Sequence, residues 1–180
     1  MGFIPEITTR VSVETDTSEL QETIKVIESD PILSQLGLIE EIESVESKLK
    51  SLEKPLGLAV SERLQSNQEI IIATKHYIKG LMANSVDITE DGDDYLVGNT
   101  AMSVDGFPYP LVIEKGRRGG YEVKPITYSA LHWIDKTTGE DVFAKVSHPG
   151  PVAPDPFVEP SIEDTMRDID DIINKQFGGL

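Results

Sequence analysis

The sequence contains no cysteine, and this absence removes several kinds of chemistry at once. The chain can form no disulfide, carry no thiol nucleophile and hold no metal through sulfur. A chain without cysteine suits a protein made in a reducing cytoplasm. No apolar run approaches the roughly 20 residues that a membrane-spanning helix requires. Residues 1–6 also lack the basic region and the long apolar core of a secretory signal.

Positive charge is scarce as well. The chain has 16 Lys and Arg against 32 Asp and Glu, for a formal net charge of −16. A protein this acidic repels nucleic acid and anionic membranes overall, because both are polyanions. The one dense basic segment contains Lys115, Arg117 and Arg118. Of the 180 residues, 38% are hydrophobic and 27% are charged, which predicts a folded core in one domain or in a domain with an appendage.

The first half of the chain predicts a short strand followed by helices. Alternation of polar and apolar residues over residues 8–14 predicts the strand, and a helix begins soon after it. Apolar residues at helical spacing predict a second helix over residues 38–52. Pro55 then predicts a break, because proline fits poorly inside a helix. A third, long helix is expected over residues 56–83.

The periodicity then changes from that of a helix to that of a strand. An Asp-Gly pair lies between two strand-like runs, residues 86–89 and 95–97, and this arrangement predicts a β-hairpin. The functional alternative is a calcium loop. Asp91, Asp93 and Asp94 do not supply the alternating oxygens and the final bidentate Glu that such a loop needs. A hairpin is therefore the favoured interpretation of this acidic turn.

A second hairpin is predicted by the runs at residues 130–134 and 142–146, which flank the turn residues 136–139. Before this hairpin, the prolines of residues 107–110 are expected to keep the backbone extended, because a residue that precedes proline avoids the helical region. After it, residues 148–157 are rich in proline and predict a turn, since proline cannot donate to a central strand.

The last predicted element is a helix that begins with Ser161 as its cap and stops at Gly178 and Gly179. Its apolar stripe contains Ile162, Met166, Ile169, Ile173 and Phe177. The predicted fold class is α+β: a small antiparallel sheet made of the two hairpins, packed by the long central helix and by this C-terminal helix. Residues 1–54 are expected to form an N-terminal strand and helical extension, and residues 55–180 the core.

No catalytic signature is present in the sequence. The three histidines, His76, His132 and His148, show no zinc-binding spacing, and the chain has no nucleophile elbow and no Walker-type loop. The glycine-rich residues 116–120 could in principle hold a phosphate. They lack the Lys-Ser/Thr pair of a phosphate-binding loop and do not clearly open a helix. We therefore predict no catalytic residue, no metal and no cofactor.

The C-terminal half contains a series of short motifs. In sequence order they are Tyr109-Pro110, Ile113-Glu114-Lys115-Gly116, Val142-Phe143-Ala144-Lys145-Val146, His148-Pro149-Gly150 and Pro154-Asp155-Pro156-Phe157-Val158-Glu159-Pro160. Their order and spacing resemble the tail-component, or neck, proteins of long-tailed bacteriophages. The resemblance covers roughly the C-terminal half of the chain, with a fainter similarity in the N-terminal half.

This resemblance implies a structural protein of the virion neck, made in the host cytoplasm, that joins the head connector to the tail. Such a protein works as a closed ring of identical subunits with a heterologous interface. Its partners would be copies of itself, the neighbouring head-completion or connector proteins, and the tail-terminator or tail-tube proteins. Genomic DNA would pass through the lumen, where an acidic wall would keep the polyanion from sticking.

Seven residues in two exposed loops are the candidate assembly interface: Lys115, Arg117, Arg118, His148, Pro149, Pro156 and Phe157. The basic loop would contact a neighbouring subunit or ring, or would face passing DNA. The prolines of the second loop lower the ordering cost of binding. Phe157 is either the apolar anchor of this docking arm or a cover for the core under the last helix. The N-terminal extension could also wrap a neighbour.

Three alternatives remain open at this stage. Within the phage neck, the chain could be the tail-terminator or the head-closure protein. Outside this class, it could be a small metal-dependent hydrolase or nuclease that uses Asp91, Asp93 and His132. An acidic DNA mimic is the third alternative, and it would bind a basic DNA-binding protein tightly.

Overall fold

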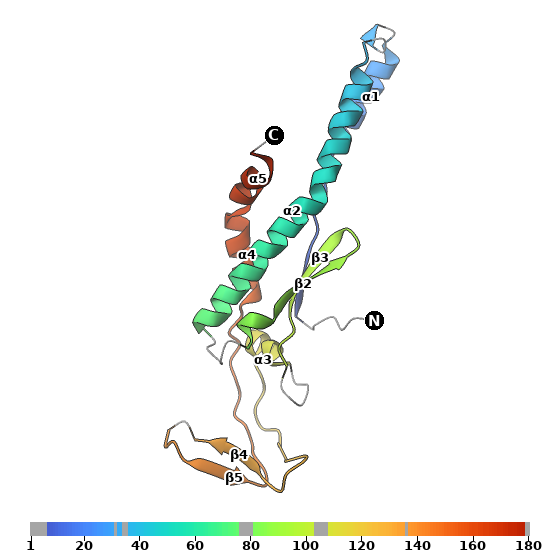
Figure 1. Cartoon of the computed structure of the whole chain (residues 1–180). Helices are drawn as coiled ribbons and strands as arrows, with labels where there is room; N and C mark the ends of the chain where they lie inside the picture. The colour runs from blue at the N-terminus through green and yellow to red at the C-terminus, as the bar shows by residue number, and fades with distance from the viewer. Residues whose placement is uncertain are drawn as a thin grey trace. The chain divides into compact units, whose positions relative to one another are not determined.

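The computed structural model describes residues 7–30, 32–33, 36–75, 81–102, 108–135 and 137–178. Some positions named in the predictions above lie outside these ranges: residues 1–6, His76, Lys136, Gly179 and position 107 of the predicted extended segment. The described chain contains α-helices and two small antiparallel sheets, so the α+β prediction is confirmed (Figure 1).

The chain forms two compact units. The helical unit comprises Met1–Ala101 and Phe157–Leu180, and the hairpin unit comprises Met102–Pro156. These boundaries differ from the predicted division after residue 54. The prediction relied on a helix break at Pro55, whereas the structure has no break there.

Helix α2, Leu38–Lys75, is the central element of the helical unit and contains Pro55 in its interior. The prediction of two separate helices is therefore wrong. A proline inside a helix removes only one hydrogen bond, and a bend of the helix relieves the clash of its ring with the preceding turn, so the helix can continue past Pro55. Figure 1 shows that α2 bends along its length. The predicted end at residue 83 is also too late, since Ala83–Ser85 form the short 3-10 helix η2.

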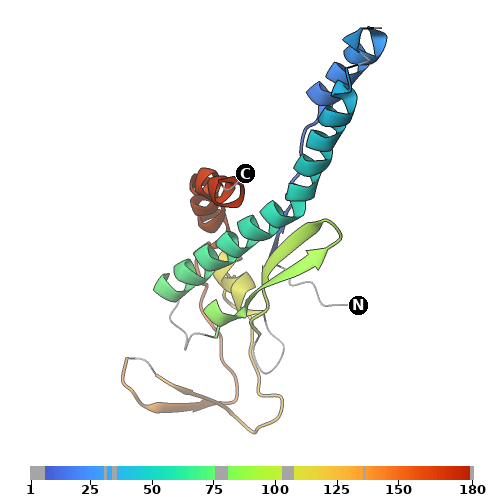
Figure 2. The same ribbon diagram turned by 45° about the horizontal axis from the view of Figure 1, so that its top comes forward.

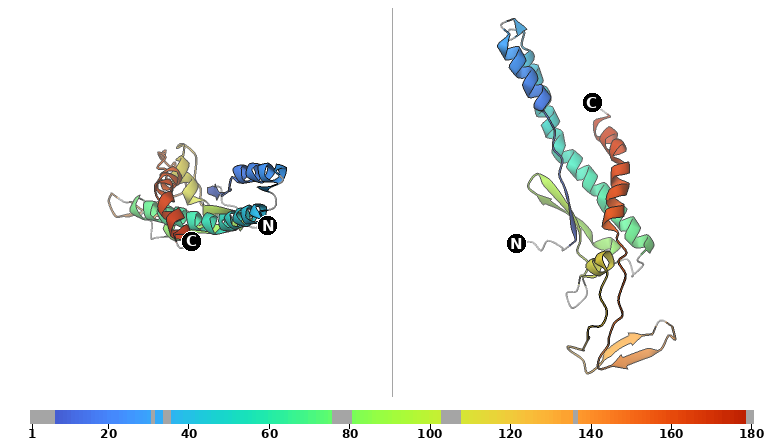
Figure 3. Two further views of the ribbon diagram at one scale, coloured as in Figure 1. Left: turned by 90° about the horizontal axis from the view of Figure 1, so that it is seen from above. Right: turned by 180° about the vertical axis from the view of Figure 1, so that it is seen from behind.

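Helix α1, Ser18–Ser29, lies beside the first part of α2 (Figure 3). Its Ile24 and Ile27 are buried, as the apolar spacing predicts. The partly buried carboxylate of Glu46, on α2, accepts hydrogen bonds from Thr17 at 3.2 Å, from Lys50 at 2.7 Å and from Gln21. This polar cluster ties the start of α1 to α2.

The first sheet packs on the later part of α2. It contains β1 (Thr8–Val11), β2 (Val86–Asp91) and β3 (Asp94–Asn99) in the antiparallel order β1-β3-β2. The Asp-Gly hairpin prediction is confirmed, with Gly92 at φ 70° in the turn. A Cβ atom on Gly57 would lie 3.3 Å from the Tyr95 ring, so this glycine permits the close approach of α2 to the sheet.

Helices α4 (Val158–Arg167) and α5 (Ile169–Phe177) pack against α2 (Figure 2). The predicted start at Ser161 is wrong by one turn, because Ser161 is buried inside α4 and its hydroxyl donates to the Val158 carbonyl at 2.6 Å. Asp168 separates α4 from α5, where one continuous helix was predicted.

The hairpin unit has its own secondary structure. Tyr109–Lys115 form helix α3, so the predicted extended backbone is wrong at Tyr109 and Pro110, whereas Pro108 is extended. Pro110 lies in the first helical turn, where a missing N–H costs no hydrogen bond. Strands β4 (Leu131–Ile134) and β5 (Asp141–Ala144) form the second predicted hairpin. They make a separate two-stranded sheet, so the predicted single sheet of two hairpins is wrong.

Candidate assembly interface

The basic loop is part of a paired backbone stem in the hairpin unit. The Arg117 amide donates to the Val152 carbonyl at 2.8 Å, and the Val152 amide donates to the Arg117 carbonyl at 2.9 Å. Val123 and Ser147 exchange a second pair of backbone hydrogen bonds, at 2.8 and 3.0 Å. The stem therefore joins the basic loop to the Pro-rich segment, two stretches that the sequence analysis placed in the candidate interface separately.

Two glycines make this pairing possible. A Cβ atom on Gly116 would lie 2.7 Å from the Val152 carbonyl oxygen, and one on Gly119 would lie 2.6 Å from the Pro151 nitrogen. Gly116 also has φ 70°, a left-handed conformation that favours glycine. The phosphate-binding alternative loses support here, because the amides of Arg117 and Gly120 already donate to carbonyls of the opposite strand.

The stem is positively charged. Residues 115–124 hold four Lys or Arg and one acidic residue, for a net charge of +3. Lys115 and Arg118 are exposed. Arg117 is half-buried, with its guanidinium 5.2 Å from the centroid of the Tyr121 ring. Lys115 and Arg118 therefore present their charge to the solvent, whereas Arg117 also stabilises the stem itself.

The β4–β5 sheet exposes large apolar side chains. Cross-strand pairs join Leu131 to Ala144, His132 to Phe143, and Trp133 to Val142. Phe143 is 68% exposed, and Trp133 is also exposed. The His132 ring stacks on Phe143 with their centroids 4.6 Å apart, and His132 Nε2 lies 2.6 Å from an Asp141 carboxylate oxygen. An isolated two-stranded sheet of this kind is marginally stable in water, so these side chains form a surface suited to a partner.

A groove of about 690 Å³ lies next to this sheet. Residues 123–132 and Phe143 line it. Ile126 and Tyr128 are both exposed on these lining residues. The groove extends the apolar surface beyond the strands. Sequence reasoning missed Ile126, Tyr128, Trp133 and Phe143, although the aromatic and β-branched residues between 126 and 143 were the available signal.

The Pro-rich turn divides into exposed and buried parts. His148 and Pro156 are exposed, and Pro149 is partly exposed. Phe157, in contrast, is 0% exposed. Phe157 is therefore part of the core under α4, which is the second of the two roles considered for it, and is not an anchor for a partner.

The acidic turn is occupied by internal contacts. Arg10 binds Asp91 and Asp94, each at 2.6 Å, and the Ser12 hydroxyl donates to Asp94 at 2.5 Å. The bonds from Ser12 and Arg10 hold the pKa of Asp94 below its ordinary value. Of the alternative catalytic set, Asp91 belongs to the helical unit and His132 to the hairpin unit. Among the residues that the structure describes, no cluster of three or more His, Asp or Glu could hold a metal.

Most of the apolar stripe of the last predicted helix does not face the core, although Ile169 and Phe177 are half-buried. Met166 is 59% exposed, and Ile162 and Ile173 are also exposed. The face that packs on α2 carries Ser161 and Thr165 instead, and both are buried. The prediction that this stripe packs in the core is therefore wrong, and the stripe is a second candidate interface.

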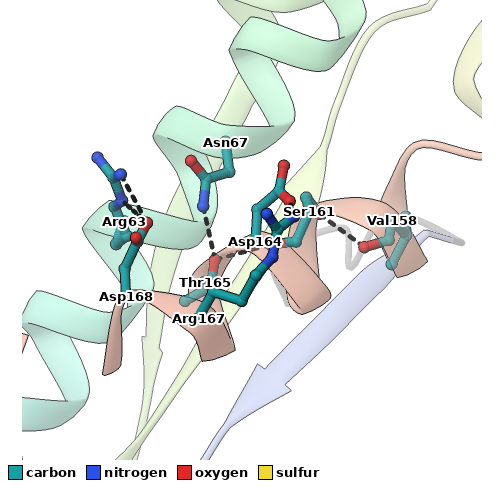
Figure 4. A network of polar contacts seen from close by, with 8 residues as sticks. All are labelled: Arg63, Asn67, Val158, Ser161, Asp164, Thr165, Arg167 and Asp168. Carbon is teal, nitrogen blue, oxygen red and sulfur yellow. Dashed lines mark hydrogen bonds and ion pairs between the residues drawn. The ribbon is translucent and has the colours of Figure 1, made fainter. Parts of the chain in front are cut away.

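Polar contacts explain this inverted arrangement (Figure 4). The buried Asn67 amide donates to the Thr165 hydroxyl at 3.0 Å, and that hydroxyl donates to the Ser161 carbonyl at 2.7 Å. One turn away, Arg63 donates to Asp168 at 2.6 and 2.8 Å. The signal in the sequence was the spacing of Ser161, Thr165 and Asp168, which places polar groups on one face opposite Arg63 and Asn67 of α2.

Comparison with known proteins gives no relative: no protein-family model, curated protein or solved structure matches the chain. In the part of the chain that the structure describes, none of the helices combines the length and the apolar character that a membrane crossing demands.

Proposed function

We propose that the chain is a structural protein of the bacteriophage neck, where it forms a ring that joins the head connector to the tail and lines the DNA channel. The order of motifs between Tyr109 and Pro160, which resembles the neck proteins, supports the phage assignment. The observation that carries the assembly role is the apolar surface of the β4–β5 sheet. The proposal gives the chain no catalytic role.

This surface supports an assembly role for an energetic reason. Ile134 and Phe143 lie on one face of the two-stranded sheet and Trp133 on the other, so both faces of the sheet carry exposed apolar side chains, and Ile134 is 61% exposed. Full burial of an exposed Ile or Phe side chain stabilises a complex by at most roughly 1.5–3 kcal/mol. Large aromatic side chains are also the residues that most often dominate interface energies. A partner protein is therefore the expected environment of the sheet.

The charge distribution fits a channel-lining ring. The hairpin unit holds six Lys or Arg and seven Asp or Glu, out of 16 and 32 in the whole chain. Its net charge is therefore −1, and the helical unit carries the remaining −15. In the proposed ring, the acidic helical unit repels the passing DNA and the nearly neutral hairpin unit makes protein contacts.

A genetic experiment tests this proposal. Deletion of the gene from a phage that encodes the chain should leave DNA-filled heads and complete tails that do not join. Wild-type protein supplied in trans should restore joined particles, and the double variant Trp133→Ser, Phe143→Ser should not. Ile70→Ser is the matched control, because Ile70 is an exposed apolar residue of α2 that belongs to neither candidate interface. Infectious particles in normal yield without the protein would contradict the proposal.

The same experiment separates the neighbouring roles in the neck. A tail-terminator protein would be found on isolated tails, and tails would grow to abnormal length without it. A head-closure protein would be found on isolated heads, which would lose DNA without it. The proposed joining role predicts stable heads and tails of normal length.

A further inference from the structure

We propose that the apolar stripe on α4 and α5 is the docking site for the hairpin unit of a second copy of the chain. The part of the stripe proposed as the docking site consists of Ile162 and Met166 on α4 and of Ile169 and Ile173 on α5, with the members of each pair four positions apart and with Ile169 half-buried. Residues four apart lie on one face of a helix, so each pair shares a face of its own helix. The inference rests on the proposed self-assembly and names the surface that the next subunit covers.

The stripe has an acidic rim. Glu159, Glu163 and Asp170 each lie three positions before one of the exposed apolar residues, and all three are exposed. Residues three apart on a helix are neighbours, so the carboxylates flank the stripe on one side. Contact with a partner at the stripe therefore brings these carboxylates close to that partner's charges.

Charge complementarity selects the hairpin unit as the occupant. Pairing of two stripes would place one acidic rim near another and cost energy through like-charge repulsion. The α1–α2 region is also acidic, with nine Asp or Glu and four Lys or Arg over residues 18–54. Residues 115–124 of the hairpin unit carry a net charge of +3, and the adjoining sheet exposes Trp133 and Phe143. The hairpin unit as a whole carries −1, but its residues 115–124 place a positive segment next to an exposed apolar surface, a combination found nowhere else among the described residues.

This contact is heterologous, because the stripe belongs to the helical unit and its occupant to the hairpin unit. Each copy therefore offers one donor surface and one acceptor surface. A repeated heterologous contact closes into a ring when the rotation between copies divides a full turn. The proposed docking thus produces the kind of assembly that the neck function needs.

Crosslinking between two tagged copies tests the docking. The chain has no cysteine, so introduced thiols react without background. One copy carries Ser129→Cys beside the exposed Tyr128, and the other carries Met166→Cys. The two purified full-length proteins are mixed and treated with a short bismaleimide crosslinker. We expect a heterodimer that contains both tags. The matched control is Ile70→Cys in place of Met166→Cys, since Ile70 is 58% exposed and Met166 is 59% exposed.

Several results would overturn the inference. Equal yields with the Ile70→Cys control would show that the reaction reports only exposure. Faster dimerisation of Met166→Cys with itself would identify stripe-to-stripe pairing. In a chain that carries both substitutions, an adduct confined to single chains would show that the hairpin unit docks within its own subunit. Absence of any crosslink across a concentration series would show that the copies do not dock in this way.

Sedimentation equilibrium provides an independent readout. Met166→Glu should weaken self-association at least about tenfold, and Ile70→Glu should leave it unchanged. Equal effects of the two variants would contradict the docking. A crosslink without the protein at the head–tail junction would sustain the docking and end the neck assignment. A ring at the head–tail junction whose subunits do not crosslink would sustain the neck assignment and contradict the docking.

Discussion

At the scale of single residues, Thr165 connects α4 to the core of the helical unit. Its hydroxyl accepts a hydrogen bond from the buried Asn67 amide and donates to the Ser161 carbonyl. Thr165→Val keeps the shape of the side chain but leaves the Asn67 amide buried without its acceptor. We expect the free energy of unfolding to fall by about 1–3 kcal/mol, measured by urea denaturation.

Thr23→Val is the matched control for this prediction. Thr23 is exposed on α1, and its hydroxyl donates to the carbonyl four residues earlier, at 2.8 Å, as that of Thr165 does. The control should change stability by less than about 0.5 kcal/mol, because surface substitutions away from special features usually do. Similar losses for the two variants would show that the buried contact to Asn67 is unimportant.

Glu46 makes the stability of the helical unit depend on pH. The hydrogen bond from Lys50, supported by bonds from Thr17 and Gln21, holds the pKa of Glu46 below its ordinary value near 4.5. At pH values between the folded-state pKa and the unfolded-state pKa of Glu46, the unfolded chain therefore binds more protons than the folded chain. The stabilisation is complete above the unfolded-state pKa and is lost as pH falls through the lower, folded-state pKa.

Thermal unfolding at two pH values tests this linkage. Glu46→Gln should be less stable than the wild type at pH 7, and the difference in Tm should shrink when pH is lowered below about 4. Glu43→Gln, which changes an exposed residue on the same helix, serves as the control. A Tm difference between Glu46→Gln and the wild type that stays constant with pH would refute the role of Glu46.

At the scale of elements, the stem of the hairpin unit depends on Gly119. A Cβ atom at this position would lie 2.6 Å from the Pro151 nitrogen, so Gly119→Ala forces the two backbones apart. We expect faster amide hydrogen exchange at Val123, Ser147 and Val152, since their hydrogen bonds hold the stem. Gly150→Ala is the control, because a Cβ atom there has no neighbour within 4 Å. Equal exchange rates in the two variants would show that Gly119 is not required for the stem.

The sequence allows some elements to be predicted and not others, for physical reasons. The Asp-Gly turn and the alternation around it predict β2 and β3, because turn geometry and strand pairing depend on local residues. Pro55 misleads, because the packing of α1 and of the sheet on the two parts of α2 outweighs the local cost of proline. The helix α3 was missed because Pro110 suits a first helical turn as well as an extended segment.

The candidate site was predicted only in part for a related reason. Lys115 and Arg118 are exposed, as expected, because long charged side chains rarely leave water. Phe157 is buried, which is one of the two roles considered for it, whereas most of the stripe around Met166 is exposed although the last helix was expected to pack through it. Periodicity shows which residues share a face of a helix, but it does not show whether the chain itself or a partner covers that face.

At the scale of the whole molecule, the division of charge predicts that self-association depends on salt. The hairpin unit carries −1 and the helical unit −15, and the proposed contact joins the basic stem to an acidic helix face. Screening lengths fall from about 10 Å at 0.1 M salt to about 3 Å at 1 M. If the attraction across the contact dominates, sedimentation equilibrium should show weaker association at high salt.

Stronger association at high salt would indicate that repulsion between the acidic helical units outweighs the attraction at the stem. The substitution Arg118→Glu distinguishes the two, because it should weaken association at low salt and have little effect at 1 M. An effect of Arg118→Glu that is the same at both salt concentrations would contradict a charge-assisted contact.

The location of the protein in phage particles tests the central claim most directly. Particles that carry a labelled copy of the chain are imaged by electron microscopy, and the label is placed in averaged images. The account predicts a closed ring of label at the junction of head and tail, and nowhere else on the particle. Label that remains entirely with free protein, with none on virions, would contradict the assignment to the neck.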